Sequence, residues 1–330
     1  MQLDFNEIKN KKNLLAFSAG VDSSALFYLL LNHNIPFDIA IVNYNLRTQA
    51  TKEVNYAKKL AQKFNKNIFI KEINFTKEPS NFEKKARDIR YDFFDEIIKN
   101  NSYETLITAH QLNDKLEWFL MQLTKGAGLF ELIGLEKCVY KKDILFYKPL
   151  LDVSKKDLQK YLEKNNHTYF IDESNLENKY KRNYFRNEYA NKLLDTYEDG
   201  IKNSFEYLQK DIESFLFNNN DFKAIKTIKN LDIFKNSNDN NLNMRLIDLN
   251  IKQRGYLLSN AQRNEILTQK EISICDGINI AISEDFIYIC PKIEFTMHKK
   301  FKEECRLNKI PKNIRPYLAK ENIEIKDLML

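Results

Sequence analysis

The stretch Leu14-Leu15-Ala16-Phe17-Ser18-Ala19-Gly20-Val21-Asp22-Ser23-Ser24-Ala25-Leu26 decides the fold of this chain. Its first four residues form an apolar run of buried-strand length, and the small residues 18–20 suit a tight turn. A helical pattern begins at Asp22, with Leu26, Leu29 and Leu30 on one face. A turn between a strand and a helix directs free backbone N–H groups and the positive helix end toward one point, which favours phosphate binding. Many such turns bind nothing, so an ordinary strand–turn–helix connection is equally compatible with this stretch alone.

Strand and helix patterns alternate after this stretch. Apolar or alternating runs at residues 37–42, 67–73 and 103–108 predict three more strands, and amphipathic stripes at residues 51–64 and 81–99 predict the helices between them. Strands separated by helices of this length predict a Rossmann-like α/β fold with a doubly wound, mostly parallel sheet.

Three polar segments follow the ends of predicted strands. They are residues 18–23, 43–47 and 109–114. Ligands of parallel α/β sheets bind outside the carboxyl ends of the strands, so we expect the three segments to converge on one crevice.

A carboxylate pair lies in the third segment and its continuation. We expect His110, Asp114 and Glu117 at the start of a helix that begins near Asn113, facing the crevice. Asp114 and Glu117 are i,i+3 neighbours that can share one cation, either an ammonium group or Mg²⁺. In the alternative, Asn113 caps the helix and the two carboxylates only complement its dipole. Convergence with the first loop favours the cation site.

Composition limits the class of protein. A chain of 330 residues is long enough for two or three domains, and its net charge of +6 permits an RNA partner without requiring one. The four cysteines, Cys138, Cys275, Cys290 and Cys305, contain no C-x-x-C pair for zinc, iron–sulfur or redox chemistry. The N-terminus lacks a signal-peptide core and the apolar runs are too short to span a bilayer, so we expect a cytoplasmic protein without a membrane partner.

The C-terminal half predicts smaller parts. A helical stripe over residues 201–216 suggests a connector, and residues 222–270 are mainly helical in pattern. Residues 278–282 and 286–290 alternate around a short polar turn, which predicts a β-hairpin in a small α+β domain. The expected division is a catalytic domain at 1–195, a helical connector at 196–220, a small α+β domain at 221–295 and a basic C-terminal segment at 296–330.

A basic and aromatic cluster occupies residues 179–186, with the sequence Lys-Tyr-Lys-Arg-Asn-Tyr-Phe-Arg. Bases stack on aromatic rings while Lys and Arg meet phosphates, so this composition suits RNA. A solvated amphipathic helix has the same composition, and spacing alone leaves both interpretations open.

The loop Ser18-Ala19-Gly20-Val21-Asp22-Ser23 closely resembles the S-G-G-x-D-S PP-loop of the N-type ATP pyrophosphatases, which holds the pyrophosphate of ATP. Further segments follow the order seen in the tRNA(Ile)-lysidine synthases, a resemblance that is firm over residues 12–195 and weaker beyond. These segments are Asn45-Leu46-Arg47, Asn81-Phe82-Glu83 with residues 86–91, residues 110–117 with 126–129, Lys148-Pro149-Leu150-Leu151, and Asp172-Glu173-Ser174-Asn175 with residues 180–186.

This resemblance implies a ligase that uses ATP and Mg²⁺ to join L-lysine to the wobble cytidine of the isoleucine tRNA with a CAU anticodon. The cytidine O2 attacks the α-phosphate of ATP, which releases pyrophosphate and leaves an adenylated base. The lysine ε-amine then displaces AMP at C2 to give lysidine, which changes codon specificity from AUG to AUA. The resemblance also makes a homodimer plausible and assigns tRNA binding to residues 221–295.

The resemblance also implies roles for individual residues. Pyrophosphate and ATP are held by Ser18, Ala19, Gly20, Val21, Asp22, Ser23 and Ser24. The catalytic residues are Asp22, His110, Asp114, Glu117 and Arg182, among which Asp22 and Asp114 hold Mg²⁺ and Glu117 and Asp114 receive the lysine ammonium. The tRNA contacts are Arg87, Arg90, Tyr180, Lys181 and Arg186.

The chain departs from the family pattern at four positions. Ala19 replaces a loop glycine, which is tolerable at a negative φ. Tyr44 and Gln111 replace histidines, and Asn113 replaces the first aspartate of the H-H-x-D-D pattern. Because Asp22, Asp114 and Glu117 remain, we expect an active enzyme. The alternatives are a PP-loop tRNA thiolase and a tRNA-binding protein that has lost turnover.

Overall fold

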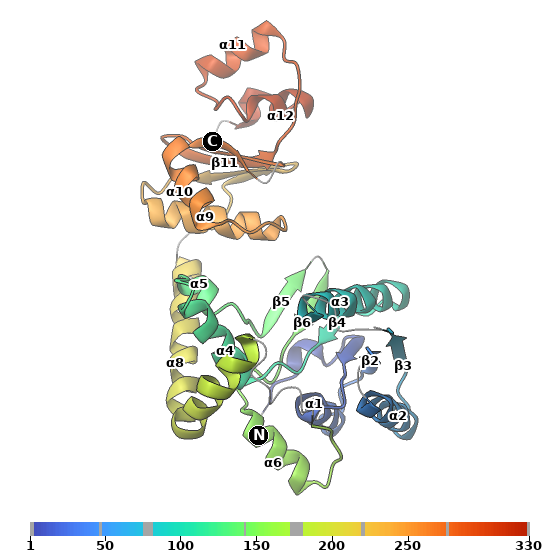
Figure 1. The fold of residues 1–330 in the computed structure, drawn as a ribbon. Helices are drawn as coiled ribbons and strands as arrows, with labels where there is room; N and C mark the ends of the chain where they lie inside the picture. The colour runs from blue at the N-terminus through green and yellow to red at the C-terminus, as the bar shows by residue number, and fades with distance from the viewer. Residues whose placement is uncertain are drawn as a thin grey trace. The chain divides into compact units, whose positions relative to one another are not determined.

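The computed structural model describes residues 3–45, 48–74, 82–141, 143–171, 181–218, 222–274 and 277–328. The chain divides into two compact units, Met1–Asp211 and Ile212–Leu330 (Figure 1). This two-part division differs from the four parts expected from the sequence, for reasons that lie in the packing of the long helix α8 and of the C-terminal helices.

The first unit is built on a six-stranded sheet with the order β3-β2-β1-β4-β6-β5. Every pair of neighbouring strands is parallel except β5 and β6, which form an antiparallel hairpin at one edge. The doubly wound, mostly parallel sheet expected from the sequence is therefore confirmed. Its strands are β1 (Asn13–Ala16), β2 (Asp38–Asn43), β3 (Ile68–Glu72), β4 (Thr105–Ile107), β5 (Cys138–Lys141) and β6 (Ile144–Tyr147).

Helices cover both faces of this sheet (Figure 1). One core joins the inner sides of α1 (Val21–Asn32), α2 (Thr48–Lys63) and α6 (Lys155–Lys164) to β1 and β2. A second core on the opposite face joins α3 (Phe82–Asn101) to the sheet. The apolar stripe predicted for α1 is buried as expected, and the short 3₁₀ helix Asn6–Ile8 adds Ile8 to the first core.

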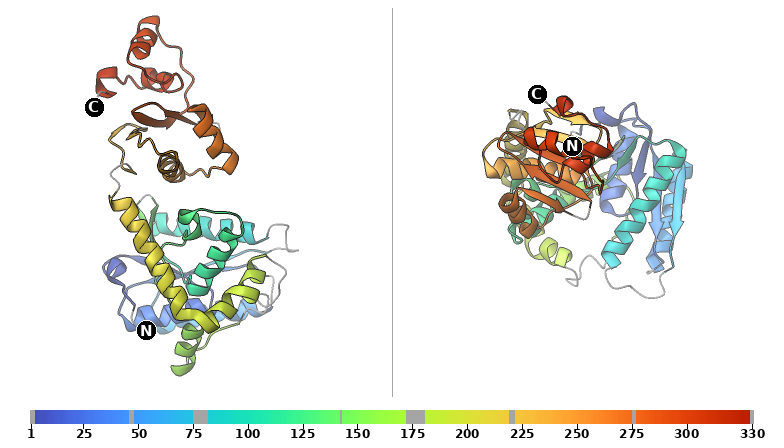
Figure 2. Two further views of the ribbon diagram at one scale, coloured as in Figure 1. Left: turned by 90° about the vertical axis from the view of Figure 1, so that its left-hand side faces the viewer. Right: turned by 90° about the horizontal axis from the view of Figure 1, so that it is seen from above.

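A third group of helices lies beside the sheet, where α8 runs next to α4 (Figure 2). It contains α4 (Leu112–Leu123), α5 (Leu129–Leu132), α7 (Lys181–Phe185), a π-helical turn (Arg186–Ala190) and α8 (Asn191–Asn218). Leu194 and Phe205 of α8 pack against Leu112 and Leu116 of α4. This burial ties most of α8 to the first unit, so residues 196–211 belong to that unit rather than to a separate connector.

The second unit contains a five-stranded antiparallel sheet with the order β7-β8-β11-β10-β9. The hairpin predicted from the sequence is confirmed, and helices fill most of residues 240–269 as expected. The strands β7 and β8 at the start of the range 222–270 were not predicted, and neither was β9, which follows that range. The elements are β7 (Lys226–Ile228), β8 (Leu231–Lys235), α9 (Asn240–Gln253), α10 (Asn260–Gln269), β9 (Glu271–Ile274), β10 (Ile278–Ile282) and β11 (Phe286–Pro291).

The C-terminal helices cover one face of this second sheet. Cys305 of α11 (Lys299–Leu307) and Tyr317 of α12 (Arg315–Lys320) share a core with Leu231 and Cys290 of the strands, and the 3₁₀ helix Ile325–Leu328 joins the same core. Residues 296–328 are therefore an integral layer of the second unit, although their exposed side is rich in lysine.

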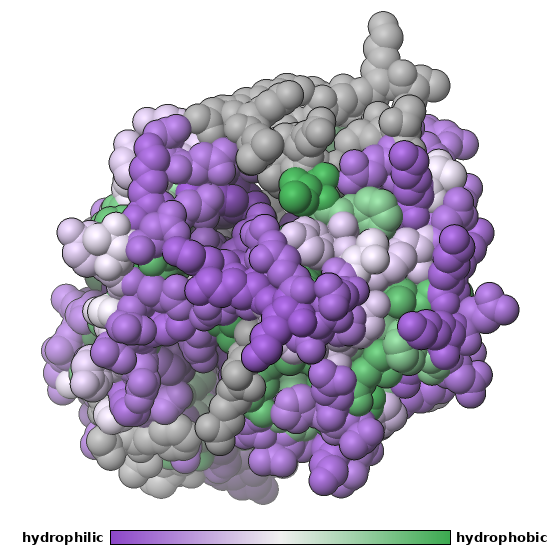
Figure 3. Space-filling view, turned by 90° about the horizontal axis from the view of Figure 1, so that it is seen from below, coloured by the Kyte–Doolittle hydropathy of each residue, from purple (hydrophilic) through white to green (hydrophobic). Residues whose placement is uncertain are grey.

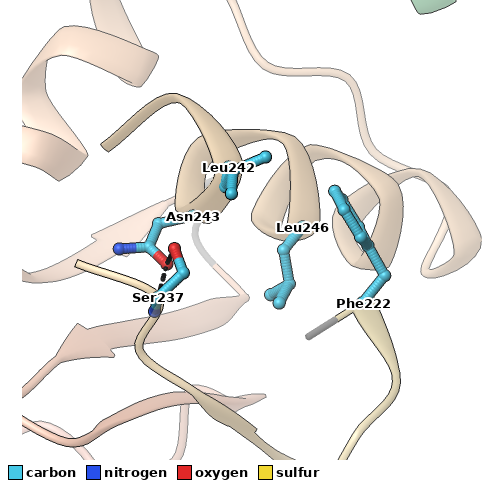
Figure 4. Close-up of a pocket in the computed structure, with 5 residues that line it drawn as sticks. All are labelled: Phe222, Ser237, Leu242, Asn243 and Leu246. Atoms are coloured by element: carbon cyan, nitrogen blue, oxygen red, sulfur yellow. Dashed lines mark hydrogen bonds between the residues drawn. The ribbon is translucent and has the colours of Figure 1, made fainter. Parts of the chain in front are cut away.

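The surface adds two observations. The face seen from below in Figure 3 is mostly hydrophilic, with apolar side chains visible in narrow strips between polar ones. A shallow depression beside α9, without room for a buried water molecule, is lined by Phe222, Ser237, Leu242, Asn243 and Leu246, none of which titrates (Figure 4). No helix within the described ranges has both the length and the apolar character needed to cross a membrane.

Candidate active site

The site lies where the order of the first sheet reverses. Strands β1 and β4 are neighbours although two strands and three helices separate them in the chain, and their carboxyl ends lie side by side. Ser18–Ser23 continue from β1, and Thr108–Asp114 continue from β4. A reversal of this kind opens a crevice at the carboxyl edge of an α/β sheet, so two of the three segments expected to converge do so here. Part of the third segment, Leu46 and Arg47, lies outside the described residues.

The loop after β1 is organised around two serine hydroxyls. The Oγ atoms of Ser18 and Ser23 lie 3.1 Å apart, and Ser23 Oγ accepts a hydrogen bond of 3.2 Å from the Ser18 N–H. Ser24 N donates to the Gly20 carbonyl at 2.9 Å, which begins α1. The preceding N–H groups of the first turn have no intrahelical acceptor and remain available to an anion.

Ala19 contradicts the expectation of a negative φ. Its φ is +60°, in the left-handed region, and its side chain is completely buried in the core of the first unit. The Ala19 carbonyl accepts a 2.9 Å hydrogen bond from Phe170 N, so the segment after α6 stabilises the loop that follows β1. The position keeps the backbone conformation of a glycine while its methyl group contributes to the core.

Asp22 lies in the first turn of α1, and its carboxyl interacts electrostatically with Asp114, Lys155 and Arg186. Its Oδ1 atom is buried and has no hydrogen-bond partner. Burial, followed by repulsion from Asp114, raises the pKa of the Asp22 carboxyl to about 7, although Lys155 and Arg186 act in the opposite direction. An unpartnered buried carboxylate oxygen suits a bound cation, which would replace the hydration that burial removes.

Gln111, rather than Asn113, is the N-cap of α4. The Gln111 side chain accepts a hydrogen bond of 2.5 Å from Asn113 N, and Asp114 Oδ2 accepts one of 3.1 Å from Gln111 N. This reciprocal pair is a capping box, and it fixes the orientation of the Asp114 carboxylate. Glutamine at position 111 therefore has a structural role that the sequence comparison with the family pattern did not reveal.

Asn113 connects three helices. Its Nδ2 donates to Asn191 Oδ1 of α8 at 2.8 Å, and its Oδ1 accepts from the backbone N–H of Lys155, the first residue of α6, at 3.0 Å. The side chain is almost completely buried. An aspartate could not donate the first of these bonds.

Two arginines meet the carboxylate pair. Arg186 Nη2 lies 2.7 Å from Asp114 Oδ1, and Arg186 Nε lies 2.8 Å from Glu117 Oε2. Arg182 Nη2 lies 3.2 Å from the same Asp114 oxygen, and Arg182 Nε lies 2.6 Å from Glu117 Oε1. The two carboxylates, three residues apart on α4, therefore face two guanidinium groups that are four residues apart on the helical segment packed against α4. Burial acts to raise the pKa of Asp114, but Arg186, His110 and Arg182 outweigh it and the pKa is lowered.

His110 lies at the end of β4 and is uncharged near neutral pH. Burial lowers its pKa to about 4, against the opposing effect of Asp114, and the cations Lys148, Arg182 and Arg87 contribute further. Thr108 Oγ1 lies 2.9 Å from His110 Nδ1, which fixes the ring. A neutral imidazole with this pKa is a hydrogen-bonding group rather than a strong base.

Lys148 is a site residue to which the sequence assigned no role. It follows β6 directly, beside the end of β4, where Thr108 N donates to the Tyr147 carbonyl at 2.9 Å. Burial lowers the pKa of Lys148, and its Nζ donates to the Glu136 carbonyl at 3.0 Å. Lys148 directly follows β6, the strand next to β4, and this position at a strand end could have been recognised in the sequence.

The residues expected to bind tRNA are distributed differently. Arg186 lies inside the carboxylate cluster rather than on the surface. Arg87 and Arg90 are exposed on α3, with the Arg87 guanidinium 4.9 Å from the centre of the Tyr91 ring, and Lys181 is exposed at the start of α7. Tyr180 and residues 172–175 fall outside the described part of the chain.

A metal site is supported at Asp22 more than at Asp114. Both Asp114 oxygens accept hydrogen bonds from the chain's own groups, whereas Asp22 Oδ1 is free. Within the described ranges, no cluster of three or more potential metal ligands exists. Mg²⁺ commonly binds through one or two carboxylates together with substrate phosphates, and Asp22 is the carboxylate here that could take part in such a site.

Tyr44, the replacement for a family histidine, supports α3. Its hydroxyl donates to the Ala86 carbonyl at 2.6 Å, and burial raises its pKa to about 12. Its ring also packs edge-on against Phe82. The residue therefore has a packing role at the start of α3.

Comparisons with known proteins agree with this geometry. Residues 2–193 match the PP-loop domain family. The chain is 43% identical to the tRNA(Ile)-lysidine synthase of Campylobacter jejuni over 97% of this chain and 96% of that protein. It is 40% identical to the tRNA(Ile)-lysidine synthase of Helicobacter pylori, covering 95% of this chain and 91% of that protein.

A solved structure shares the fold. The U34-tRNA thiolase NcsA from Methanococcus maripaludis has a TM-score of 0.51 and 20% identity, covering 64% of this chain and 75% of that one. This likeness concerns the fold alone. The PP-loop match over the first unit and the identity with the curated relatives along nearly the whole chain show that the protein belongs to the tRNA(Ile)-lysidine synthase family, within the PP-loop proteins.

Proposed function

We propose that the crevice at the end of β1 and β4 ligates L-lysine to C2 of the wobble cytidine of the isoleucine tRNA with a CAU anticodon. Members of this family are ATP-dependent ligases that form a C–N bond, and the product would change codon reading from AUG to AUA. The observation that carries the proposal is the meeting of an anion-binding loop with a buried carboxylate pair at one switch point.

In the first step, the cytidine O2 forms a bond to the α-phosphorus of ATP while the bond from that phosphorus to the bridging oxygen breaks. The electron pair leaves with pyrophosphate. Negative charge therefore grows on the leaving group, where the free N–H groups of the first turn of α1 and the hydroxyls of Ser18 and Ser23 can donate to it.

Asp22 is the residue that would hold Mg²⁺ in this step. A bound magnesium ion supplies charge neutralisation to the phosphates of ATP. The free Oδ1 of Asp22 lies on the first turn of α1, beside the same N–H groups, so one carboxylate serves both the loop and the cation.

Before the second step, Asp114 and Glu117 attract the lysine ammonium, which gives one proton to water. The neutral ε-amine then forms a bond to C2 while the C2–O2 bond breaks, AMP leaves with the electron pair, and the new nitrogen gives its next proton to water. His110, being uncharged, orients the transferring group by hydrogen bonding rather than by taking the proton, because a base with a pKa near 4 holds protons weakly at pH 7.

The tRNA itself needs contacts beyond the wobble base. Arg87, Arg90 and Lys181 supply exposed cations on the first unit, and Lys299, Lys300 and Lys302 do so on α11 of the second. The place of action that we propose is the cytoplasm. A homodimer remains a prediction, which sedimentation of the purified chain tests.

The decisive experiment measures ATP-dependent incorporation of labelled lysine into isoleucine tRNA bearing a CAU anticodon, together with the nucleotide product. We expect AMP and pyrophosphate, and loss of incorporation in Asp22→Asn. Asp199→Asn, on the exposed side of α8, is the matched control and should incorporate lysine normally. ADP as the product, or incorporation that is unchanged in Asp22→Asn, would contradict the proposal.

The two alternatives are less well supported. A thiolase requires cysteines that carry sulfur or a cluster, but Cys290 and Cys305 are buried in the core of the second unit and Cys138 is on β5. A protein without turnover would have no need to keep an unpartnered buried carboxylate at Asp22, which destabilises the fold unless a ligand uses it.

A further inference from the structure

The carboxylates that the proposed reaction needs for lysine are already paired with cations of the chain. Asp114 and Glu117 together carry two negative charges, and Arg182 and Arg186 together carry two positive charges at 2.6 to 3.2 Å from them. Side chains of Asp114 and Glu117 are only 10% and 3% exposed. The cluster is therefore neutral, and its two carboxylates are almost completely removed from water.

The two arginines are not equivalent. Arg186 has 16% of its side chain exposed, and it bridges both carboxylates with contacts of 2.7 and 2.8 Å. Arg182 has 40% of its side chain exposed, and it also bridges both carboxylates, with a contact of 2.6 Å to Glu117 Oε1 and a longer one of 3.2 Å to Asp114 Oδ1. Both guanidinium groups share that one oxygen. Arg182 is thus the cation that can return to water at the lower cost.

The difference in exposure between Arg182 and Arg186 matters because the charges of the cluster must stay balanced when lysine binds. An incoming lysine ammonium would add a third positive charge to a neutral, buried cluster. Without a compensating change, that charge would be desolvated and unpaired, which is strongly unfavourable. Departure of one guanidinium restores neutrality and frees the oxygens that the ammonium needs.

We propose that Arg182 is an exchangeable counterion, whose place at Glu117 Oε1 and Asp114 Oδ1 is taken by the lysine ammonium, while Arg186 stays as a fixed positioning residue. This inference rests on the proposed function. Arg182 of α7 lies four residues before Arg186, the first residue of the π-helical turn that continues α7, so the released guanidinium remains beside the crevice. There it meets the phosphate oxygens of ATP or of the adenylated base.

The exchange couples two binding events. Phosphates attract Arg182 away from the carboxylates, so bound nucleotide should raise the affinity for lysine, and by linkage lysine should raise the affinity for nucleotide by the same factor. A lysine site on a neutral pair without a competing arginine would show no such coupling.

The test measures lysine binding to the full-length protein by calorimetry, with and without an ATP analogue whose α,β-bridge cannot be cleaved. In the unsubstituted chain, lysine should bind at least about fivefold more tightly when the analogue is present, a typical coupling between linked sites. Arg182→Gln should bind lysine tightly without nucleotide and lose the coupling, while its turnover falls. Arg186→Gln should lose lysine binding in both conditions.

Arg182→Lys is the conservative variant, which keeps the competing charge. It should retain part of the coupling, which a merely structural role would not predict, and it keeps the test available if Arg182→Gln does not fold. Fluorescence of Trp118, the single tryptophan and the neighbour of Glu117, verifies the fold of each variant.

The outcomes separate the two proposals. If Arg182→Gln weakens lysine binding as much as Arg186→Gln does, or if the analogue leaves the lysine affinity of the unsubstituted chain unchanged, the exchange is wrong and the ligase function stands. If the unsubstituted chain binds no lysine with or without the analogue, both proposals are overturned.

Discussion

Replacing Ala19 by glycine should leave the stability of the first unit almost unchanged, although Ala19 has a φ of +60°. Relief of the left-handed conformation is worth about 1–2 kcal/mol. Against it stand the greater freedom of glycine in the unfolded chain, about 0.4–1 kcal/mol, and the loss of one completely buried methyl group, about 0.8 kcal/mol. These contributions offset each other, so the free energy of unfolding should change by less than about 1 kcal/mol.

Valine at the same position should behave differently. Its branched side chain is unfavourable at a positive φ and adds volume to a site with no exposed surface, where overpacking costs about 1–3 kcal/mol in addition to the strain. Ala19→Val should therefore be clearly destabilised, and release of pyrophosphate should fall because the loop N–H groups lose their arrangement.

Urea unfolding followed by tryptophan fluorescence measures both variants. Trp118 is in α4, so its signal reports the first unit alone. Formation of AMP from ATP measures the loop in the same samples. A change of more than about 2 kcal/mol in Ala19→Gly, or a stability of Ala19→Val equal to that of the unsubstituted chain, would refute the assigned balance of strain and burial.

Three further predictions follow from single residues. Gln111→Ala removes the N-cap of α4 and should lower the free energy of unfolding of the first unit by about 1 kcal/mol in the same urea experiment. His110 is held neutral in the folded state but titrates normally in the unfolded state, so the unfolded state binds more protons between pH 6.5 and 4. Acidification from pH 8 to 5 should therefore lower the free energy of unfolding by about 2 kcal/mol, and His110→Gln should largely abolish this loss. Burial raises the pKa of Cys290 to about 12, so iodoacetamide at pH 8 should leave Cys290 unmodified in the native protein and alkylate it after unfolding, as peptide mass spectrometry would show.

Much of the first unit could be predicted because its signals are local. A buried apolar run followed by small residues and a helical stripe places the loop at Ser18, and the alternation of strands and helices places Asp114 near it. The segment 226–235 was harder. Strands β7 and β8 have three and five residues, too few for a period of two to be distinguished from a helical stripe, and the packing of α12 on Leu231 decides the outcome.

The sequence predicted which residues belong to the site better than it predicted which of them form ion pairs with one another. Asp114 and Glu117 were expected to share a cation because of their i,i+3 spacing after a strand, and Asp22 was assigned by the family resemblance, but the place of Arg186 was not predicted. The cluster at 179–186 allowed either a surface helix or an RNA contact, and only the packing of α7 and its π-helical continuation on α4 turns Arg186 toward Glu117. Such a helix–helix interface depends on tertiary contacts that no local pattern encodes.

The replacement of an aspartate by Asn113 changes the role of that position without removing the reactive groups. Asn113 donates to Asn191 and accepts from the Lys155 backbone, so it fixes the relative positions of α4, α6 and α8, which carry or support the carboxylates. A carboxylate there could not donate to Asn191 Oδ1, so Asn191 would have to reorient and this connection between the helices would change. In the reaction we propose, Asp22 would serve the phosphates and the Asp114–Glu117 pair would receive lysine, and Asn113 removes none of these three carboxylates, so we expect turnover despite the absence of the family aspartate at position 113.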